Sequence, residues 1–230
     1  MNLNEHSDLR GKHSTFSPSN PAFFNYSPEE FYMRLLGKYR SSLGTDIHEW
    51  VSISIKRFHK VTSVREMIKD IDSYIFKKYY VEKYDQLTDD GTRILECLRH
   101  VSRNHPEVFE TVKSYVNDAI GFKMKSEVVL FYSKDFFGTA DALIFTNNNL
   151  RIHDLKTGSG PVHIEQLIGY AALFCLEYHV SPAKIKTELR IYQNNDILVA
   201  TPSGDDIKGF MDKYRLFNDI IRTNEEANNG

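Results

Sequence analysis

The sequence predicts a fold of the α/β (α+β) class, in which a helical N-terminal half packs on a mixed central β-sheet. Three observations lead to this prediction. Apolar residues recur at helical spacing up to about residue 120, short β-rich runs begin near residue 125, and one helical segment lies among those runs. Since a strand, a helix and a returning strand normally form a parallel, right-handed crossover, we expect the sheet to contain parallel as well as antiparallel pairs.

Five helices are expected in the N-terminal half. Ser27 caps the first and Pro28 occupies its first position, while Thr45 or Asp46 caps the second. Gly121 is expected to end the last of them. The predicted helices are residues 28–39, 46–58, 63–80, 89–103 and 106–120.

The sheet and its covering helices follow. Three asparagines at residues 147–149 separate two apolar, β-rich runs and indicate a hairpin turn. A helix at 163–178 supplies the crossover, and a helix at 205–222 closes the fold. The predicted strands are residues 125–132, 138–145, 150–156, 185–192 and 197–201.

The chain of 230 residues is long enough for one well-buried domain and short for two. We expect a polar lead-in at residues 1–20, a single domain at 21–222 and a tail at 223–230. No run approaches 18 consecutive apolar residues, and the first residues lack the pattern of a signal peptide. We therefore expect a cytoplasmic protein without a membrane span, in which Cys97 and Cys175 are reduced thiols of the core.

Two carboxylates and a lysine cluster around the predicted hairpin. Because side chains alternate along a strand, Asp154 and Lys156 should point to one face and Leu155 to the other. Asp141 lies early on the preceding strand, and antiparallel pairing can bring it opposite the same end. This arrangement predicts an acidic pocket that binds Mg²⁺ or Mn²⁺, with the ammonium group of Lys156 at its edge. The alternative is a pair of strand-end carboxylates that a lysine merely balances.

A longer pattern surrounds these residues, with G-T-A-D at 138–141, I-H-D-L-K-T-G at 152–158 and Q-L-I-G-Y at 166–170. In order, spacing and strand–turn–strand–helix context, this pattern resembles the PD-(D/E)XK nuclease superfamily, and within it the RecB-type branch and the related phage exonucleases. Two further segments are similar to blocks that occur in the same order in that family. They are L-G-T-D-I-H-E at 43–49 and S-E-V-V-L-F at 126–131.

The resemblance, over roughly residues 40–180, implies a restriction-endonuclease-like fold and assigns roles to the site residues. Asp141 and Asp154 would hold the metal ion, with the backbone carbonyl of Leu155 as a further ligand. Lys156 would orient the attacking water or stabilise charge in the transition state. On the crossover helix, Gln166 would contact the lysine or the nucleic acid, and Tyr170 would contact the backbone phosphate.

Two more metal ligands are implied by the resemblance, and each has a structural alternative. His48 would reach the metal site, although a single histidine on a helix is otherwise structural. Glu127 would add an acidic ligand, although a lone glutamate at the start of a strand is otherwise exposed to solvent. Asp46 and Glu49 lie in the first turn of the helix predicted to carry His48, where the helix dipole explains them.

The function implied by the resemblance is a Mg²⁺- or Mn²⁺-dependent deoxyribonuclease, an exonuclease of the phage type that acts on DNA ends in recombination or repair. The alternatives are a structure-specific endonuclease and a non-catalytic nucleic-acid-binding protein on a nuclease fold. The expected partner is DNA, as duplex ends or single strand, and the partners could include a recombination protein; a phage-encoded enzyme would act in the cytoplasm of its bacterial host. Two cysteines cannot supply the four ligands of the iron–sulfur cluster that some RecB-type nucleases carry, so no cluster is expected.

The overall charge does not by itself indicate a nucleic-acid binder, because the formal net charge is −2 at pH 7. Basic residues do gather locally, and each cluster is either a solvated face or part of a DNA-binding surface. The clusters are Lys123, Lys125 and Lys134 before the hairpin, and Lys184, Lys186 and Arg190 near the last strands.

Overall fold

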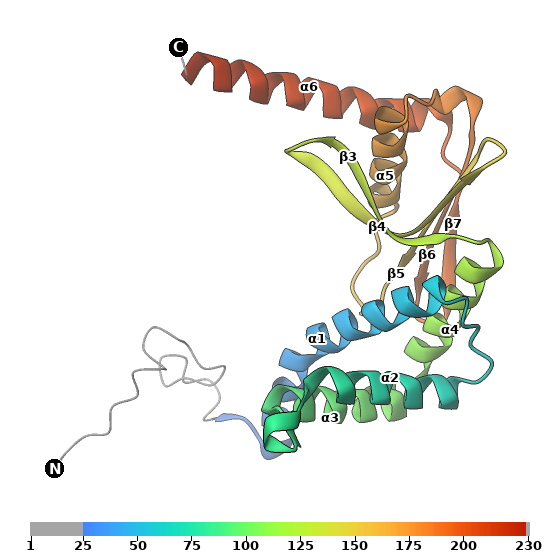
Figure 1. The fold of residues 1–230 in the computed structure, drawn as a ribbon. Coiled ribbons are helices and arrows are strands. Elements are labelled where there is room, and N and C mark those ends of the chain that lie inside the picture. Colours follow the sequence, from blue (N-terminus) through green and yellow to red (C-terminus); the bar gives the residue numbers. More distant parts are fainter. Residues whose placement is uncertain (1–24, 229–230) are drawn as a thin grey trace.

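A five-stranded mixed sheet separates two groups of helices in the computed structural model, which describes residues 25–228 (Figure 1). Helices α1 to α4 lie on one side of the sheet, and α5 and α6 lie on the other. The helices are α1 (Pro28–Lys56), α2 (Val64–Tyr79), α3 (Asp89–Asn104), α4 (Pro106–Gly121), α5 (Ile164–Glu177) and α6 (Gly204–Asn228). The α+β fold class predicted from the sequence is confirmed.

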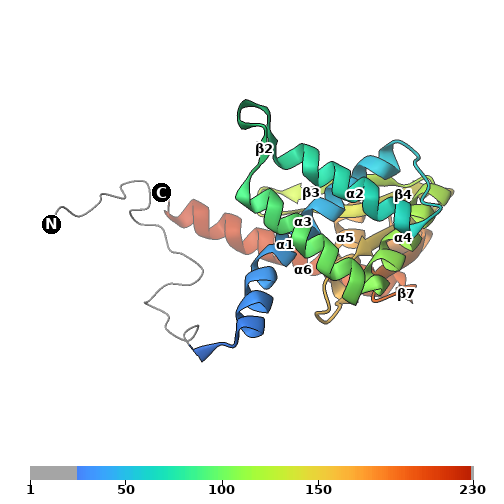
Figure 2. The same ribbon diagram turned by 90° about the horizontal axis from the view of Figure 1, so that it is seen from below.

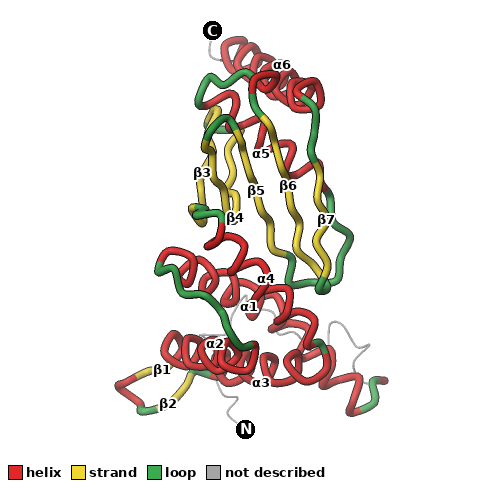
Figure 3. The backbone as a smooth tube through the Cα atoms, turned by 90° about the vertical axis from the view of Figure 1, so that its right-hand side faces the viewer, coloured by secondary structure: helices red, strands yellow, loops and turns green. Residues whose placement is uncertain are grey.

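The sheet has the strand order β3-β4-β5-β6-β7, and Figure 3 shows its five strands above the helices α1 to α4. The β5–β6 pair is parallel and α5 makes the crossover between the two strands, while the other pairs are antiparallel. Asn147 and Asn148 both have positive φ, as a two-residue hairpin turn requires, so the predicted turn is confirmed. The strands are β3 (Lys125–Ser133), β4 (Phe136–Thr146), β5 (Asn149–Leu155), β6 (Lys186–Gln193) and β7 (Asp196–Ala200).

Helix α1 is continuous, and the prediction of two helices separated near residues 40–45 is wrong. Ser27 does cap α1, accepting a hydrogen bond from the backbone N–H of Glu30. The hydroxyl group of Thr45, however, donates to the carbonyl of Ser41 one turn earlier instead of capping a new helix. A single buried stripe runs through the expected break, so packing against α3 and α4 keeps Gly44 helical. The stripe consists of Leu36, Leu43, Ile47, Trp50 and Val51.

The helices on the α1 side form two layers. Helices α2 and α3 lie side by side, separated from the sheet by α1 and α4 (Figures 1 and 2). Between α2 and α3 the chain makes a small hairpin that the sequence did not predict, with β1 (Tyr80–Val81), the 3₁₀ turn η3 (Glu82–Tyr84) and β2 (Gln86–Leu87). A second 3₁₀ turn, η4 (Pro182–Lys184), precedes β6.

Two buried clusters hold the layers together, and each contains one free cysteine. Cys97 packs among the side chains of α1 to α4, and Cys175 packs among those of α5, α6 and the opposite sheet face. Burial raises the pKa of both thiols, to about 11 for Cys175. No helix within residues 25–228 is long and apolar enough to cross a membrane.

The C-terminal end of the domain differs from the prediction. Helix α6 continues to Asn228, beyond residue 222 where we predicted its end, and its later turns extend past the sheet (Figure 1). The predicted lead-in at residues 1–20 lies outside the described part of the chain.

Asp46 and Glu49 join α1 to α2 and do not lie in a first helical turn, so their explanation by the helix dipole is wrong. The ammonium group of Lys78 on α2 lies 2.7 Å from Asp46 Oδ1 and 2.5 Å from Glu49 Oε2. Asp46 is only 1% exposed, and these carboxylates raise the pKa of Lys78 against the effect of its own burial. The hydroxyl group of Tyr74 also donates to Glu49.

We therefore expect Lys78→Met to lower the free energy of unfolding by about 2 kcal/mol, because it leaves the carboxylate of Asp46 buried without its cation. Chemical denaturation monitored by circular dichroism measures this change. Lys77→Met, one residue earlier on the exposed face of the same helix, is the matched control and should change stability little. Equal stability of the two variants would contradict a supporting role for the α1–α2 ion pair.

Candidate active site

The candidate site lies where β4 separates from β5, at Asp141 in the middle of β4. Strand β4 pairs with β3 from Phe136 to Leu143, but it pairs with β5 only from Ala142 onward. At Asp141, just before this pairing begins, a side chain takes the place of a backbone hydrogen bond between the two strands. Asp141 Oδ2 accepts a hydrogen bond of 2.9 Å from the N–H of Leu155. Our expectation that Asp141 lies early on its strand is therefore corrected: it lies at the internal point where the two strands part.

The regular alternation of β4 is interrupted at the same point. Ala140 and Ala142 are two residues apart and would share a face on a regular strand. Ala140 instead packs in the cluster of α5 and α6, whereas Ala142 packs in the cluster of α1 to α4. The change of face at Asp141 directs the β3–β4 hairpin away from the rest of the sheet (Figures 1 and 3). It leaves room for a pocket between β4, β5 and α1.

Asp154 and Lys156 meet on one face of β5, as their alternation predicts. The ammonium nitrogen of Lys156 lies 3.1 Å from Oδ1 and 3.0 Å from Oδ2 of Asp154, so it bridges both oxygens. Gln166, in the first turns of α5, accepts a further hydrogen bond of 3.2 Å from the same ammonium. Asp154 is only 4% exposed while the Lys156 side chain is 32% exposed, so the carboxylate is at the base of the site and the ammonium at its mouth.

His48 and Glu127 approach the other carboxylate, Asp141, from α1 and β3. His48 Nδ1 lies 3.6 Å from Asp141 Oδ2. Glu127 lines the same cavity and has a φ of 54°, a left-handed conformation that is uncommon for a residue other than glycine. Together with Asp154, these side chains bring four of the predicted site residues to one place.

The carboxylates perturb one another electrostatically. Burial raises the pKa of Asp141; His48 and Lys156 act to lower it, and the charge of Asp154 raises it further. Burial raises the pKa of Glu127 too, and the charge of Asp141 adds to the effect. The site therefore contains crowded anions that a bound cation would relieve.

Two adjoining cavities, of about 540 Å³ and 320 Å³, open onto these residues and share His48 and Asp141. The first is lined on the α1 side by Arg40, Ser41, Gly44 and Thr45. The second contains Asp154, Lys156, Gln166 and the ring of Tyr170. Thus every predicted site side chain lines one of the two cavities. Leu155 donates its backbone N–H group to Asp141, and its carbonyl stays a predicted metal ligand.

Two glycines allow close contacts around the pocket. A Cβ atom on Gly44 would lie 3.0 Å from Thr157 Oγ1, so the Thr157 side chain or α1 would have to shift by a few tenths of an ångström. A Cβ atom on Gly138 would lie 2.9 Å from Cε1 of Tyr170. The glycines of these two sequence blocks are therefore explained by the approach of a distant segment.

Gln193 was not predicted, yet it holds the loop that borders both cavities. Its side-chain amide donates to the carbonyl groups of Gly158, at 2.6 Å, and Gly160, at 2.8 Å. A polar residue at the end of a strand carries no signal of this role, because the loop and β6 are more than thirty residues apart in sequence.

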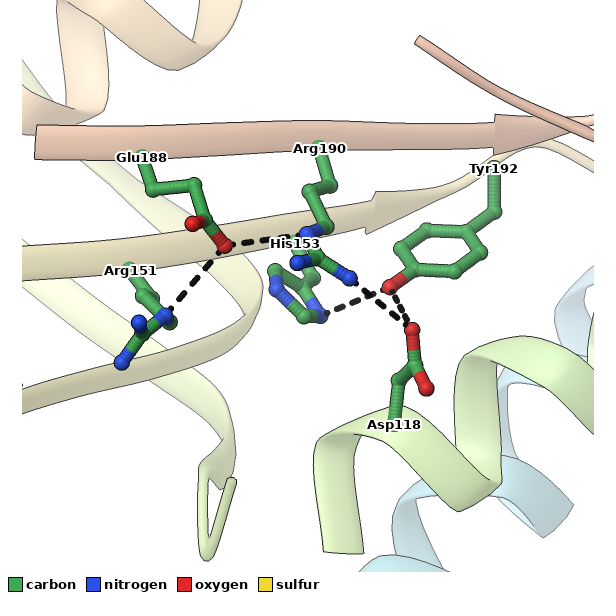
Figure 4. Close-up of polar contacts among 6 residues, drawn as sticks. All are labelled: Asp118, Arg151, His153, Glu188, Arg190 and Tyr192. Carbon is green, nitrogen blue, oxygen red and sulfur yellow. Dashed lines mark hydrogen bonds and ion pairs between the residues drawn. The ribbon is translucent and has the colours of Figure 1, made fainter. Parts of the chain in front are cut away.

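A polar network lies behind β5, on the side of α4 (Figure 4). His153 is fully buried, and burial, together with the nearby charges of Arg190 and Arg151, lowers its pKa to about 3. The hydroxyl group of Tyr192 donates to Asp118 Oδ2 at 2.7 Å, and Arg190 contacts the same oxygen at 3.1 Å. The backbone carbonyl of Tyr192 also accepts a hydrogen bond of 2.9 Å from the N–H of Lys156. The network therefore anchors the end of β5, where Asp154 and Lys156 lie.

The network also shows where two further side chains lie. His153 faces away from the pocket, as the alternation of β5 predicts. Arg190, placed by the sequence in a basic surface cluster, is a partly buried member of the network that also pairs with Glu188 and lies over the ring of Phe122. Its side chain is 20% exposed, so Arg190 is not the freely solvated cation that the sequence cluster suggested.

The donor set of the pocket suits a hard cation in chemical type. Within the described residues, no three His, Cys, Asp or Glu side chains are grouped so as to hold a metal ion. Asp141 and Asp154 offer oxygen ligands, and Glu127 is a third carboxylate, on the cavity that shares Asp141. Oxygen donors of this kind are typical of Mg²⁺ and Mn²⁺ sites.

Comparison with known proteins gives a family but no activity. No curated protein and no solved structure matches the chain. The model of one family, described as "Protein of unknown function (DUF2800)", matches residues 39–193, which is more than half of the chain and includes every predicted site residue. The matched region extends from the middle of α1 to the end of β6 and leaves out β7 and α6. The chain therefore belongs to the DUF2800 family.

Proposed function

We propose that this protein is a metal-dependent deoxyribonuclease of the PD-(D/E)XK type that hydrolyses phosphodiester bonds at DNA ends. The observation that carries the proposal is the meeting of Asp141, Asp154, Lys156 and Gln166 at one pocket, at the point where β4 leaves β5. These residues come from two strands and a helix, and a chance D-x-K sequence would not bring them together with a second acid.

The lysine has the position that charge stabilisation needs. Its ammonium lies at the mouth of the pocket and is held there by Asp154 on one side and Gln166 on the other. A phosphate that entered the pocket would meet a positioned cation, which favours the additional negative charge of the transition state over the ground state. Tyr170, on the next turn of α5 after Gln166, borders the same space and can donate to a phosphate oxygen.

Asp141 and Asp154 would hold the cation, with Glu127 as the available third carboxylate and His48 beside Asp141. When bound, a divalent cation supplies Lewis-acid activation of the phosphate and of the attacking water. Asp141 also fixes the backbone of Leu155 through its hydrogen bond, so the same side chain orients β5 against β4.

The rival function is nucleic-acid binding without catalysis. It is favoured by one observation, that the described residues contain no group of three ligands already arranged for a metal. The rival predicts DNA binding that is indifferent to divalent cations, and this difference makes the two functions separable.

We expect the protein to degrade linear duplex DNA in the presence of Mg²⁺ or Mn²⁺ and to be inactive in excess chelator, because the site offers crowded carboxylates that need a cation. Gel analysis of linear DNA beside covalently closed circular DNA measures this. An exonuclease degrades only the linear form, and cleavage of the circle would assign an endonuclease. Cleavage that persists in excess chelator would contradict the metal mechanism, and DNA binding without any cleavage would favour the rival.

A further inference from the structure

One face of the β3–β4 hairpin carries large apolar side chains that nothing in the described structure covers. Val129, Phe131 and Phe137, here called the hairpin face, are 57%, 51% and 62% exposed. Phe131 and Phe137 are directly paired across the two strands, and their ring centroids are 6.5 Å apart. Aromatic pairs of this kind normally bury their surface, so their exposure side by side indicates a binding surface.

The opposite side of the same hairpin is fully packed. Leu130 and Ala140 are completely buried against α5, and Gly138 lies against the ring of Tyr170. A strand pair with one buried face normally presents polar residues on the other. The apolar residues of the hairpin face therefore do not serve the core of this chain.

The hairpin face continues into the candidate active site. Thr139, which lines the cavity of Asp154 and Lys156, pairs directly with Val129. Phe131 and Phe137 follow on the same face, two residues further along each strand, which is about 7 Å away. A ligand strand that leaves the pocket over Thr139 would thus meet Val129 first and the aromatic pair next.

The charged groups of the pocket lie on its other sides. Lys156 is at the mouth of the smaller cavity, and Arg40, an exposed residue of α1, lines the larger one. An occupant that matches both features has anionic groups on the side of α1 and β5, and flat apolar groups on the side of the hairpin. A single nucleic-acid strand has this division, since phosphates line one edge and unpaired bases project from the other.

We propose that the hairpin face is a stacking platform for the unpaired bases of a DNA strand whose phosphates enter the pocket. This proposal rests on the nuclease function proposed above and adds that the bound strand is single, or unwound at its end. Stacking on Phe131 and Phe137 requires the flat faces of bases, and an intact duplex hides these faces except at its last base pair.

The test measures binding in excess chelator, so that no strand is cleaved. The probes are a fluorescent single-stranded oligonucleotide, the same strand with abasic sites in place of its bases, and a covalently closed duplex circle, which has neither ends nor unpaired bases. Phe137→Ser and Phe131→Ser should each weaken binding of the single strand by about fivefold or more, because each removes a ring on which a base would stack. Binding of the closed duplex should change less than about twofold, and the abasic strand should bind the parent protein as weakly as the normal strand binds the serine variants.

Three further variants separate stacking from other roles of the face. Phe137→Trp should retain binding, because it keeps an aromatic ring, whereas Phe137→Leu should lose it despite remaining apolar. Val199→Ser is the matched control: Val199 is 52% exposed on β7, at the opposite edge of the sheet from the hairpin. Thermal melts of the variants should match the parent, since all of these side chains are already largely exposed.

Several outcomes would overturn the platform without touching the nuclease proposal. Equal binding of normal and abasic strands, or full binding by Phe137→Leu, would show that bases do not stack on the hairpin. A dimer in light scattering that dissociates in Phe137→Ser would instead assign the face to a second copy of the chain. Conversely, base-dependent binding without cleavage in Mg²⁺ would support the platform while contradicting the nuclease function.

Discussion

Asp154→Asn is expected to abolish DNA cleavage while leaving the protein folded. Asparagine keeps the volume of the side chain but removes the charge that a hard cation needs, and metal activation supplies several kcal/mol of transition-state stabilisation. We therefore expect cleavage to fall on the order of a thousandfold or more. Binding of Mg²⁺, measured by calorimetry, should fall with it.

The apo protein should remain about as stable as its parent. The charge of Asp154 raises the pKa of Asp141, so its removal relieves repulsion between the two carboxylates. Lys156 loses its ion pair but keeps its hydrogen bond to Gln166 and stays partly exposed to water. A thermal melt tests this balance.

DNA should still bind to Asp154→Asn, and its affinity should fall steeply with salt because Lys156 and Arg40 remain. A mobility-shift titration measures this retention. Asp196→Asn, on the exposed strand β7, is the matched control and should cleave at the parental rate. If Asp154→Asn also cleaved at that rate, the active site would lie elsewhere in the chain.

Lys156→Ala is expected to lower kcat by about a hundredfold or more and DNA affinity far less. The ammonium at the mouth of the pocket would act mainly on charge that develops during the reaction, so its loss affects turnover more than binding. Calorimetry should still detect Mg²⁺ binding, because Asp141 and Asp154 remain. Single-turnover kinetics at saturating DNA separate the two effects.

Lys186→Ala is the matched control for that experiment. It removes the same side chain from β6, at the end of the sheet where β5 begins and away from the pocket. A thermal melt checks that Asp154, which is 4% exposed, tolerates the loss of its ion pair. A fall in turnover of less than about threefold in Lys156→Ala would make the lysine structural and contradict its catalytic assignment.

Much of the fold could be predicted because its signals are local. Helix caps, the asparagine turn and the change from helical to alternating apolar spacing each extend over a few residues, and the order of strands and helices from residue 63 onward followed from them. The small β1–β2 hairpin was missed because its strands are two residues each, too short to show a pattern. The end of α6 was placed too early, at residue 222.

Predictions failed where a distant segment decides the local outcome. Gly44 and Thr45 look like the boundary between two helices, but burial of one continuous stripe keeps α1 intact. Arg190 looks like a surface cation, but Asp118 on α4 and Glu188 hold it in the network behind β5. In both cases the tertiary contacts outweigh the preference of the short sequence.

Short stretches of sequence are enough to predict which residues alternate onto one face of β5, where the chain turns, and which acids and lysine are available for a site. The tertiary structure alone decided that β4 leaves β5 at Asp141, that α1 delivers His48 to that carboxylate, and that Gln166 holds Lys156 from α5. Backbone conformation follows from neighbours a few residues away, whereas the meeting of α1, the hairpin and α5 follows from apolar burial summed over the whole molecule.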